Sequence, residues 1–247
     1  MLRNIVLFSL IVICALLGPE RLAQAASLQD ARGITSAVPS AKAKKIKLFG
    51  SREIKSRSVK SFAKWASMWR RHNLPRSTNK PASVLARPVM GLCGPETKII
   101  CNRDLWEKFI VDQADVSLGE LLKSVNLFMN RSTYIVDAVN WGIPDYWATP
   151  DEFFLRDGDC EDYAISKYVT LKRLGVDPSL MRLVILQDEN LRAAHAVLAV
   201  KLDGHYMILD NQVNSVLPDT KILHYRPVYS INESGWWLHH KRRFSTP

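Results

Sequence analysis

The feature that most restricts the fold is the order along the chain of two kinds of hydrophobic pattern, one typical of helices and one typical of strands. Up to Gly175, apolar residues recur at steps of three and four, which is typical of amphipathic helices. Three stretches typical of strands follow: "MRLVILQ", "HAVLAVKL" and "HYMILDN". Helices followed by neighbouring strands predict an α+β domain with a helical N-lobe and an antiparallel-sheet C-lobe.

Four segments before the strands carry a helical pattern. They are 59–71, 104–113, 117–130 and a longer helix from Cys160 to a stop at Gly175. "SLGE" matches a capping box, and "ATPDEFF" places a Thr cap before a Pro at the first helical position. The aromatic segment "YIVDAVNWGIPDYW" between these helices has no sustained period and is predicted to be a loop.

The N-terminal residues predict export and cleavage of a signal peptide. Residues 1–25 contain Arg3, an apolar run of 13 residues and the small-x-small sequence "AQA", which is typical of a cleaved signal peptide. The run is shorter than the roughly 20 residues that cross a bilayer, although an uncleaved anchor remains the alternative. We therefore expect an exported protein with no stable membrane span after cleavage, comprising a flexible lead-in at 26–45, a folded domain at 46–240 and a basic tail at 241–247.

The net charge limits the classes of binding partner, and the cysteine spacing limits the possible disulfides. The formal net charge is +10, much of it between residues 42 and 80. Export argues against nucleic acid as the partner, so this stretch is either a solvated basic surface or a face for anionic lipid or an acidic protein. Cys93 and Cys101 bracket a Gly-Pro turn and form either a disulfide or two buried small residues. Cys160 is then the odd thiol.

The second and third strand stretches predict an imidazole–carboxylate pair. With Asp203-Gly204 as a two-residue turn, residue 202 lies opposite 205, residue 197 opposite 210 and residue 195 opposite 212. His195 and Asp210 then become diagonal neighbours on one face of the hairpin. A carboxylate that orients an imidazole is the base half of a nucleophilic catalytic site.

Cys160 is the candidate nucleophile for that pair. It follows a Gly-Asp turn at the start of a helix, where free backbone amides and the helix dipole favour a thiolate. The alternative is a buried helical cysteine, a strand histidine satisfied by backbone groups and an ordinary turn acid.

Three acids surround this cysteine in "GDCEDY". Asp159, Glu161 and Asp162 provide the hard oxygen ligands that Ca²⁺ prefers, and a bound ion would offset their charge. The alternative is that they only complement the helix N-terminus, each contributing about 0.3–1 kcal/mol.

Several motifs in the same order resemble one known family. "DYWATPDEFF", "GDCEDYAISKY", "RLVILQD", "HAVLAV", "LDNQ" and "HYRPVYSINESGWWLH" resemble the bacterial transglutaminase-like cysteine proteinases over residues 46–240. The resemblance implies a papain-like, transglutaminase-like fold and a Cys-His-Asp triad at Cys160, His195 and Asp210. It also implies a calcium requirement, with Asp159 and Glu161 as ligands and Asp162 a weaker correspondence.

The resemblance further implies a substrate and a regulator. The substrate is a large surface adhesin cut near its N-terminus at a di-alanine site, which promotes biofilm dispersal. The regulator is a LapD-type inner-membrane receptor for cyclic di-GMP, and the location that the resemblance implies is the periplasm. We expect the Cys160 amide to be one oxyanion donor and Trp147, by analogy, a second. Acyl transfer to an amine and a catalytically dead calcium-binding module are the rival functions.

Overall fold

The computed structural model describes residues 46–74, 98–113 and 115–240, with the side chains of 98–101 excepted. The predicted signal peptide, lead-in and basic tail, and the predicted pairing of Cys93 with Cys101, lie outside the described residues and side chains. Among the described helices, none is long and apolar enough to cross a membrane.

The predicted helices are present, with small differences in their bounds. In chain order the helical elements are η1 (Leu48–Gly50), α2 (Ala63–His72), α3 (Lys98–Asp112), α4 (Leu118–Met129), α5 (Asp137–Asn140), α6 (Pro150–Arg156), α7 (Cys160–Arg173), η2 (Pro178–Leu180) and η3 (Asp219–Lys221). The short helix α5 lies inside the aromatic segment that was predicted to be a loop, so that prediction was wrong there. A single turn of helix is too short for its period to be recognised in a sequence.

Side-chain caps fix where two of the helices begin, as the sequence predicted. The Ser117 hydroxyl accepts the Glu120 N–H at 3.4 Å before α4. At α6, the Thr149 hydroxyl accepts the Glu152 N–H at 3.2 Å, and the Glu152 carboxylate accepts the Thr149 N–H at 2.7 Å. This reciprocal pair satisfies two amides that would otherwise lack partners at the start of α6.

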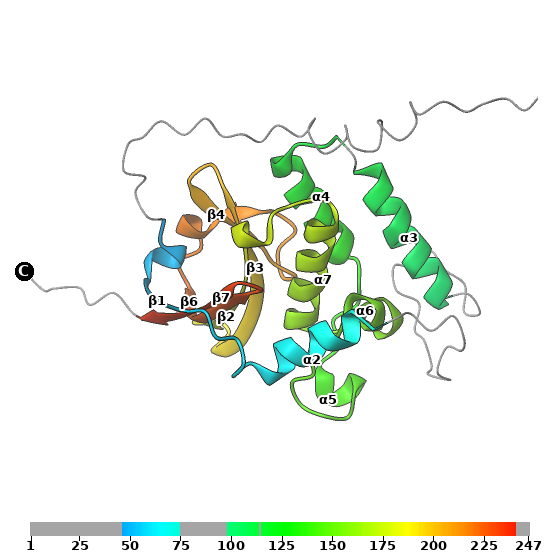
Figure 1. Ribbon diagram of the computed structural model, residues 1–247, viewed down its shortest axis with the longest axis horizontal. Helices are drawn as coiled ribbons and strands as arrows, with labels where there is room; N and C mark the ends of the chain where they lie inside the picture. Colours follow the sequence, from blue (N-terminus) through cyan, green and yellow to red (C-terminus); the bar gives the residue numbers. More distant parts are fainter. Residues whose placement is uncertain (1–45, 75–97, 114, 241–247) are drawn as a thin grey trace, which may run out of the picture. The chain divides into compact units, whose positions relative to one another are not determined.

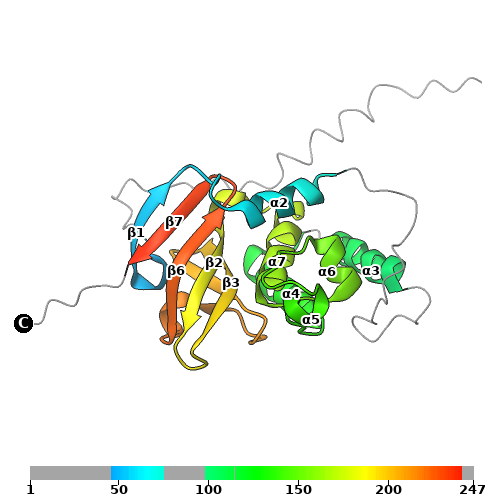
Figure 2. The ribbon, with the colours of Figure 1, turned by 90° about the horizontal axis from the view of Figure 1, so that it is seen from below.

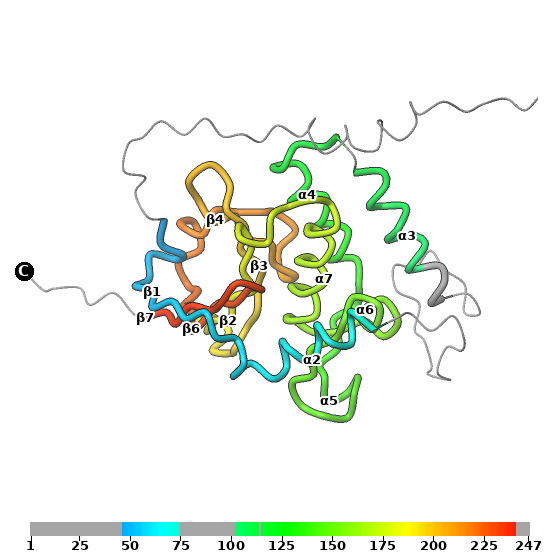
Figure 3. Tube along the Cα trace, viewed as in Figure 1, coloured from blue at the N-terminus to red at the C-terminus, as the bar shows by residue number. Residues whose placement is uncertain are grey.

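The strands form one sheet of seven with the order β1-β7-β6-β2-β3-β4-β5, and every neighbouring pair is antiparallel. The strands are β1 (Arg52–Ser56), β2 (Met181–Asp188), β3 (Ala193–Leu202), β4 (His205–Leu209), β5 (Leu217–Pro218), β6 (Tyr225–Asn232) and β7 (Gly235–His240). Strand β1 precedes the helices α2 to α7 yet pairs with β7, as the trace in Figure 3 shows. The sheet is therefore not built from the C-terminal half alone.

The register of the β3–β4 hairpin is the predicted one. Leu202 lies opposite His205, and the pairing continues without a shift to Leu198 opposite Leu209. The turn residue Asp203 has a positive φ of 46°, which Asp tolerates better than most residues. Because β4 ends at Leu209, the next residue, Asp210, leaves the sheet beside the first residues of β3.

Two hydrophobic clusters lie on the two faces of this sheet. The larger one packs the helices against β2 and β3 through residues such as Leu121, Ile165 and Leu198 (Figures 1 and 2). The smaller one contains Val197 and Tyr225 on the other face, with η1 packed over it. Alternation along β3 separates the two sets, since successive strand residues point to opposite faces.

Candidate active site

The β3–β4 hairpin carries the predicted imidazole–carboxylate pair. His195 Nε2 and Asp210 Oδ1 are 2.9 Å apart, and both side chains are 4% exposed. Because an ionised carboxylate only accepts, Nε2 carries the hydrogen and donates it. In the neutral ring, Nδ1 is then left as the proton acceptor, which is the arrangement a general base needs.

Asp210 is held by groups from several elements. Its Oδ1 also accepts the Gln212 N–H at 2.9 Å, and its Oδ2 accepts the Tyr225 hydroxyl at 2.6 Å. Its backbone carbonyl accepts the side-chain amide of Asn130, at the end of α4, at 2.8 Å. Burial by itself would raise the pKa of Asp210, but the hydrogen bonds and the charge of His195 lower it below its usual value.

Cys160 is brought to this pair by the packing of α7 against β3. It is the first residue of α7, as predicted, and is partly exposed. The backbone N–H of Ala196 is a hydrogen-bond donor to its thiol group. Since Ala196 directly follows His195 in β3, the three predicted residues gather at one place although 50 positions separate the first from the last.

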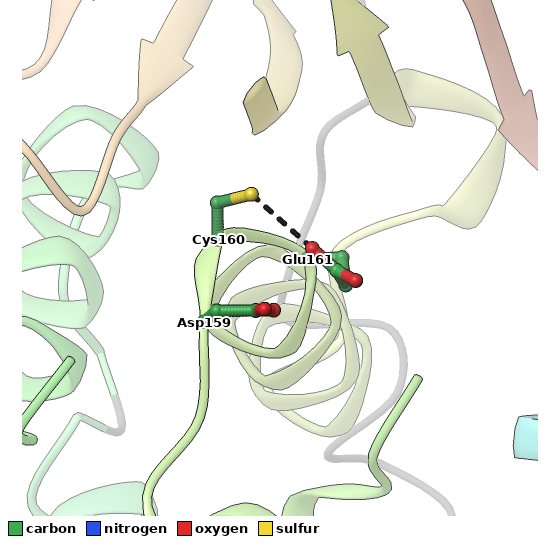
Figure 4. A group of neighbouring side chains, drawn as sticks. All are labelled: Asp159, Cys160 and Glu161. Carbon is green, nitrogen blue, oxygen red and sulfur yellow. Dashed lines mark hydrogen bonds between the residues drawn. The ribbon is translucent and has the colours of Figure 1, made fainter. Parts of the chain in front are cut away.

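The thiol itself is bonded to an acid. Cys160 Sγ lies 3.2 Å from Glu161 Oε2, with the thiol as the donor (Figure 4). Burial, followed by the negative charge of Glu161 and Asp159, raises the pKa of Cys160 far above its usual value. Uncompensated, the neighbouring acids therefore hold the nucleophile in its unreactive form.

These acids belong to a larger cluster than the sequence predicted. Ligand atoms of Asp159, Cys160 and Glu161 lie within 4.8 Å of one another, and so do those of Asp137, Asp159 and Asp162. Asp137 comes from α5, the helix that the sequence did not predict. Asp159 belongs to both groups, so it joins the thiol side of the cluster to the α5 side.

Unpartnered oxygens in this cluster fit a hard cation. Oδ1 of Asp137 and Oδ1 of Asp159 are buried, and neither has a hydrogen-bond partner among the described residues. Burial, with the charge of Asp159 added, raises the pKa of Asp137 to about 6, and burial also raises the pKa of Asp159. Buried carboxylate oxygens without donors are destabilising, and a divalent cation satisfies them.

Asp162 has a different environment. Its Oδ1 accepts the Ala148 N–H at 2.7 Å, and its Oδ2 accepts the Asp159 N–H at 3.3 Å. A Cβ atom on Gly158 would lie 2.3 Å from the same Oδ2, so only glycine fits there. Asp162 therefore fastens the loop before Cys160, and it also offers a carboxylate oxygen to the group that contains Asp137 and Asp159.

The residue before that glycine is conformationally strained. Asp157 has φ 64° and ψ −164°, a region that side chains rarely adopt. The Thr133 N–H donates to its carboxylate at 3.1 Å, and the Ile135 N–H donates to the Gly158 carbonyl at 2.9 Å. The segment before α5 thus holds the loop in the shape that presents Cys160.

The expected oxyanion role of Trp147 is not supported. Its indole N–H donates to Asp145 Oδ1 at 2.9 Å, and its ring packs in the core at 6.4 Å from that of Trp65. The backbone amide of Cys160, at the start of α7, remains the predicted donor.

Sequence reasoning missed two residues of this site. Asp137 lies 22 positions before Asp159, in a segment without periodicity, and no spacing rule connects them. Tyr225 lies within the quoted motif "HYRPVYS", but strand β6 was not predicted, so its approach to Asp210 could not be inferred.

Comparisons with known proteins agree with this geometry. The family model for bacterial transglutaminase-like cysteine proteinase BTLCP matches residues 91–242. A search of curated proteins returned no match. Among solved structures, Legionella pneumophila LapG is 32% identical, with a TM-score of 0.53, covering 57% of this chain and 77% of that one.

Two further structures of the same relative differ in their treatment with calcium. The calcium-bound form is 30% identical, with a TM-score of 0.53, and the match covers 60% of this chain and 86% of that one. The EGTA-treated form is 32% identical, with a TM-score of 0.54 and coverages of 59% and 80%. The family match extends over more than half of the chain and includes Cys160, His195 and Asp210. The chain therefore belongs to the bacterial transglutaminase-like cysteine proteinases.

Proposed function

We propose that this chain is a calcium-dependent periplasmic cysteine endopeptidase whose triad is Cys160, His195 and Asp210. The observation that carries the proposal is the buried His195–Asp210 pair beside the helix that begins with Cys160. Neither a binding module nor a structural domain needs an oriented imidazole next to a thiol, whereas peptide hydrolysis does.

The proposed reaction passes through a thioester. Nδ1 of His195 takes the thiol proton, and the thiolate of Cys160 attacks the scissile carbonyl carbon, whose electron pair moves to oxygen. The Cys160 N–H stabilises that oxyanion. His195 then gives its proton to the leaving amine as the C–N bond breaks. A water molecule, deprotonated by His195, attacks the thioester and releases the acid and the thiol.

Asp159, Glu161 and Asp162, joined by Asp137, are the residues that would hold calcium. Each contributes a carboxylate oxygen to the cluster described above, and Asp162 also fixes the backbone before Cys160. A bound Ca²⁺ would supply positive charge that offsets these acids beside the thiol. The existence of calcium-bound and EGTA-treated structures of the LapG relative supports this part of the proposal.

The proposed substrate is the N-terminal region of a large surface adhesin, cut at a di-alanine site so that the adhesin is released and the biofilm disperses. The proposed regulator is a LapD-type inner-membrane receptor that sequesters the protease when cyclic di-GMP is abundant. Both follow from the family resemblance, and the predicted signal peptide supports the proposed periplasmic location of this chain.

One incubation tests the proposal. The chain without residues 1–25 is mixed with a purified N-terminal fragment of a large adhesin that contains a di-alanine site, with calcium or with chelator. We expect two fragments with calcium, none with chelator, and none with Cys160→Ala. Cleavage by Cys160→Ala would contradict the triad, and cleavage in chelator would contradict the calcium requirement alone.

The same products separate the rival functions. Isopeptide-linked species in place of fragments would show acyl transfer to an amine. Binding of the fragment without any covalent product, unchanged in Cys160→Ala, would show a catalytically dead module.

A further inference from the structure

Tyr225 is buried against both members of the strand pair. It is the first residue of β6, is 3% exposed, and donates its hydroxyl to Asp210 Oδ2 at 2.6 Å. Its ring centroid lies 5.7 Å from that of His195 and 6.1 Å from that of Phe49. One side chain thus contacts the imidazole through its ring and the carboxylate through its hydroxyl.

The two oxygens of Asp210 have different donors. Oδ1 accepts from His195 at 2.9 Å and from the Gln212 N–H at 2.9 Å, whereas the donor to Oδ2 is the Tyr225 hydroxyl. With donors on one oxygen only, the carboxylate could rotate about its Cβ–Cγ bond and still satisfy them partly. The short hydrogen bond from Tyr225 to the other oxygen prevents this rotation. It therefore also fixes the orientation in which the carboxylate holds the His195 ring.

The hydroxyl of Tyr225 stays a donor over the working pH range. Burial, followed by the hydrogen bond to Asp210, raises the pKa of Tyr225 well above its usual value. A neutral phenol beside an ionised carboxylate donates, because the carboxylate can only accept.

We propose that Tyr225 is a positioning residue of the catalytic site, which fixes the Asp210 carboxylate so that Nδ1 of His195 faces Cys160. This inference rests on the proposed peptidase function and adds a fourth side chain to the triad. In this role Tyr225 acts through its hydrogen bond to Asp210 and its ring contact with His195.

The ionisable groups around Asp210 determine what loss of the hydroxyl should do to the pH dependence. His195 faces it from β3, Lys167 acts on it from α7, and Tyr225 reaches it from β6. Cys160 on α7 and Asp188 on β2 act on Tyr225 itself. Removing a donor from a buried carboxylate raises its pKa, so a larger fraction of Asp210 is protonated at acidic pH.

The test is Tyr225→Phe, with Tyr206→Phe as the matched control. Tyr206 lies in the same hydrophobic cluster, and its buried hydroxyl has no hydrogen-bond partner in the part of the chain that the structure describes. With the adhesin fragment and calcium, we expect Tyr225→Phe to lower kcat by about tenfold with KM unchanged. The acidic limb of its kcat/KM profile should move to higher pH, while Tyr206→Phe follows the unaltered protein.

Phe keeps the ring contacts with His195 and Phe49, so the fold is expected to persist, and the unfolding temperature verifies this. Site-specific 3-fluorotyrosine at position 225, a stronger donor, should move the acidic limb the opposite way. ¹⁵N NMR shifts of the His195 ring give a readout without substrate: one tautomer in the unaltered protein and a mixture in Tyr225→Phe.

The outcomes separate this inference from the function on which it rests. Wild-type kcat, pH profile and His195 tautomer in Tyr225→Phe, alongside an inactive Cys160→Ala, would overturn the role of Tyr225 alone. An equal loss in Tyr225→Phe and Tyr206→Phe would also overturn it, because packing would then explain both. Cleavage by Cys160→Ala would overturn the triad, and with it the proposed thiol mechanism on which this inference rests.

Discussion

The two halves of the site differ in how completely their polar atoms are satisfied. On the strand side, both oxygens of Asp210 accept hydrogen bonds, and His195 has its carboxylate partner. On the helix side, Asp137 Oδ1 and Asp159 Oδ1 are buried without partners in the described part of the chain. The strand half is therefore complete within the protein, whereas the helix half has ligand positions left over.

This difference assigns separate tasks to the two halves. The strand half sets the geometry of the base without outside help. The helix half presents the proposed nucleophile, Cys160, among acids whose charge raises its pKa, so under the proposed function its activity requires a cation. Changes in one half should then leave the other intact.

The largest expected effect comes from breaking the strand half. Asp210→Asn should lower kcat on the order of 10³-fold, because the amide cannot hold His195 in the tautomer that leaves Nδ1 basic. Cleavage of the adhesin fragment measures the loss. Thermal stabilisation of the same variant by calcium should match that of the unaltered protein, and its disappearance would show that the halves are not independent.

Calcium should act on the other half alone. At a calcium concentration of one hundred times its Kd, the free energy of unfolding should rise by about 2.7 kcal/mol. Asp137→Asn should remove most of this gain, since it takes one carboxylate from the cluster. Asp112→Asn, an exposed acid paired with Lys108 on α3, is the control. Equal stabilisation of both variants, measured by thermal unfolding, would place the ion elsewhere.

Lys167 extends the comparison along α7. It is fully buried, and its Nζ has no hydrogen-bond partner within the described ranges. Burial lowers its pKa from 10.5 to about 7, opposed by the charge of Asp210. Between these values the unfolded chain binds the proton preferentially, so stability should rise as pH increases through this window.

Lys167→Met should remove that dependence. The free energy of unfolding of Lys167→Met, compared with that of the unaltered protein, should fall by on the order of 2 kcal/mol between pH 7 and pH 9, because only the unaltered protein gains stability over this range. Chemical denaturation at the two pH values measures the difference. A difference in free energy of unfolding that is the same at both pH values would mean that burial does not desolvate the amine of Lys167.

His239 offers the opposite case, a buried ionisable group with every partner in place. Ser51 donates its hydroxyl to the Leu48 carbonyl at 2.7 Å and so accepts from Nδ1 of His239 at 2.7 Å. Nε2 then accepts from the Ser230 hydroxyl at 2.9 Å. This network satisfies both nitrogens of the neutral ring, and burial, with the charge of Arg182, lowers the pKa of His239 to about 4.

A dependence of comparable size but opposite cause follows from this network. Since the folded-state pKa lies below the unfolded value of 6.5, stability should be complete above pH 6.5 and decline as pH falls towards 4. The slope attributable to His239 should be on the order of 1 kcal/mol per pH unit. Chemical denaturation of the unaltered protein and of His239→Gln over this pH range isolates the contribution of His239. If the free energies of unfolding of the two proteins change in parallel with pH, His239 is not the group responsible.

The sequence was most informative where local rules act. The two-residue turn at Asp203-Gly204 determines the β3–β4 register, and that register alone brings His195 to Asp210. Likewise, the Gly-Asp turn before Cys160 placed it at a helix start. Both follow from backbone geometry over a few residues.

The residues that the sequence did not predict reach the site through contacts between distant parts of the chain. Asp137 reaches the acidic cluster from a one-turn helix, and Tyr225 reaches Asp210 from a strand that gave no clear alternation. Their positions depend on tertiary contacts rather than on spacing. The papain-like fold and the triad residues could be proposed early, but the groups that support them could not.

The pairing of β1 with β7 also has a kinetic consequence. Arg52 lies opposite His240, so this ladder joins segments at the two ends of the described domain. Closing so long a loop has a high entropic cost, which is offset only after the rest of the sheet exists. We therefore expect β1 to dock late in folding. Ile54→Ala, on this edge strand, should speed unfolding and leave the refolding rate nearly unchanged in stopped-flow measurements.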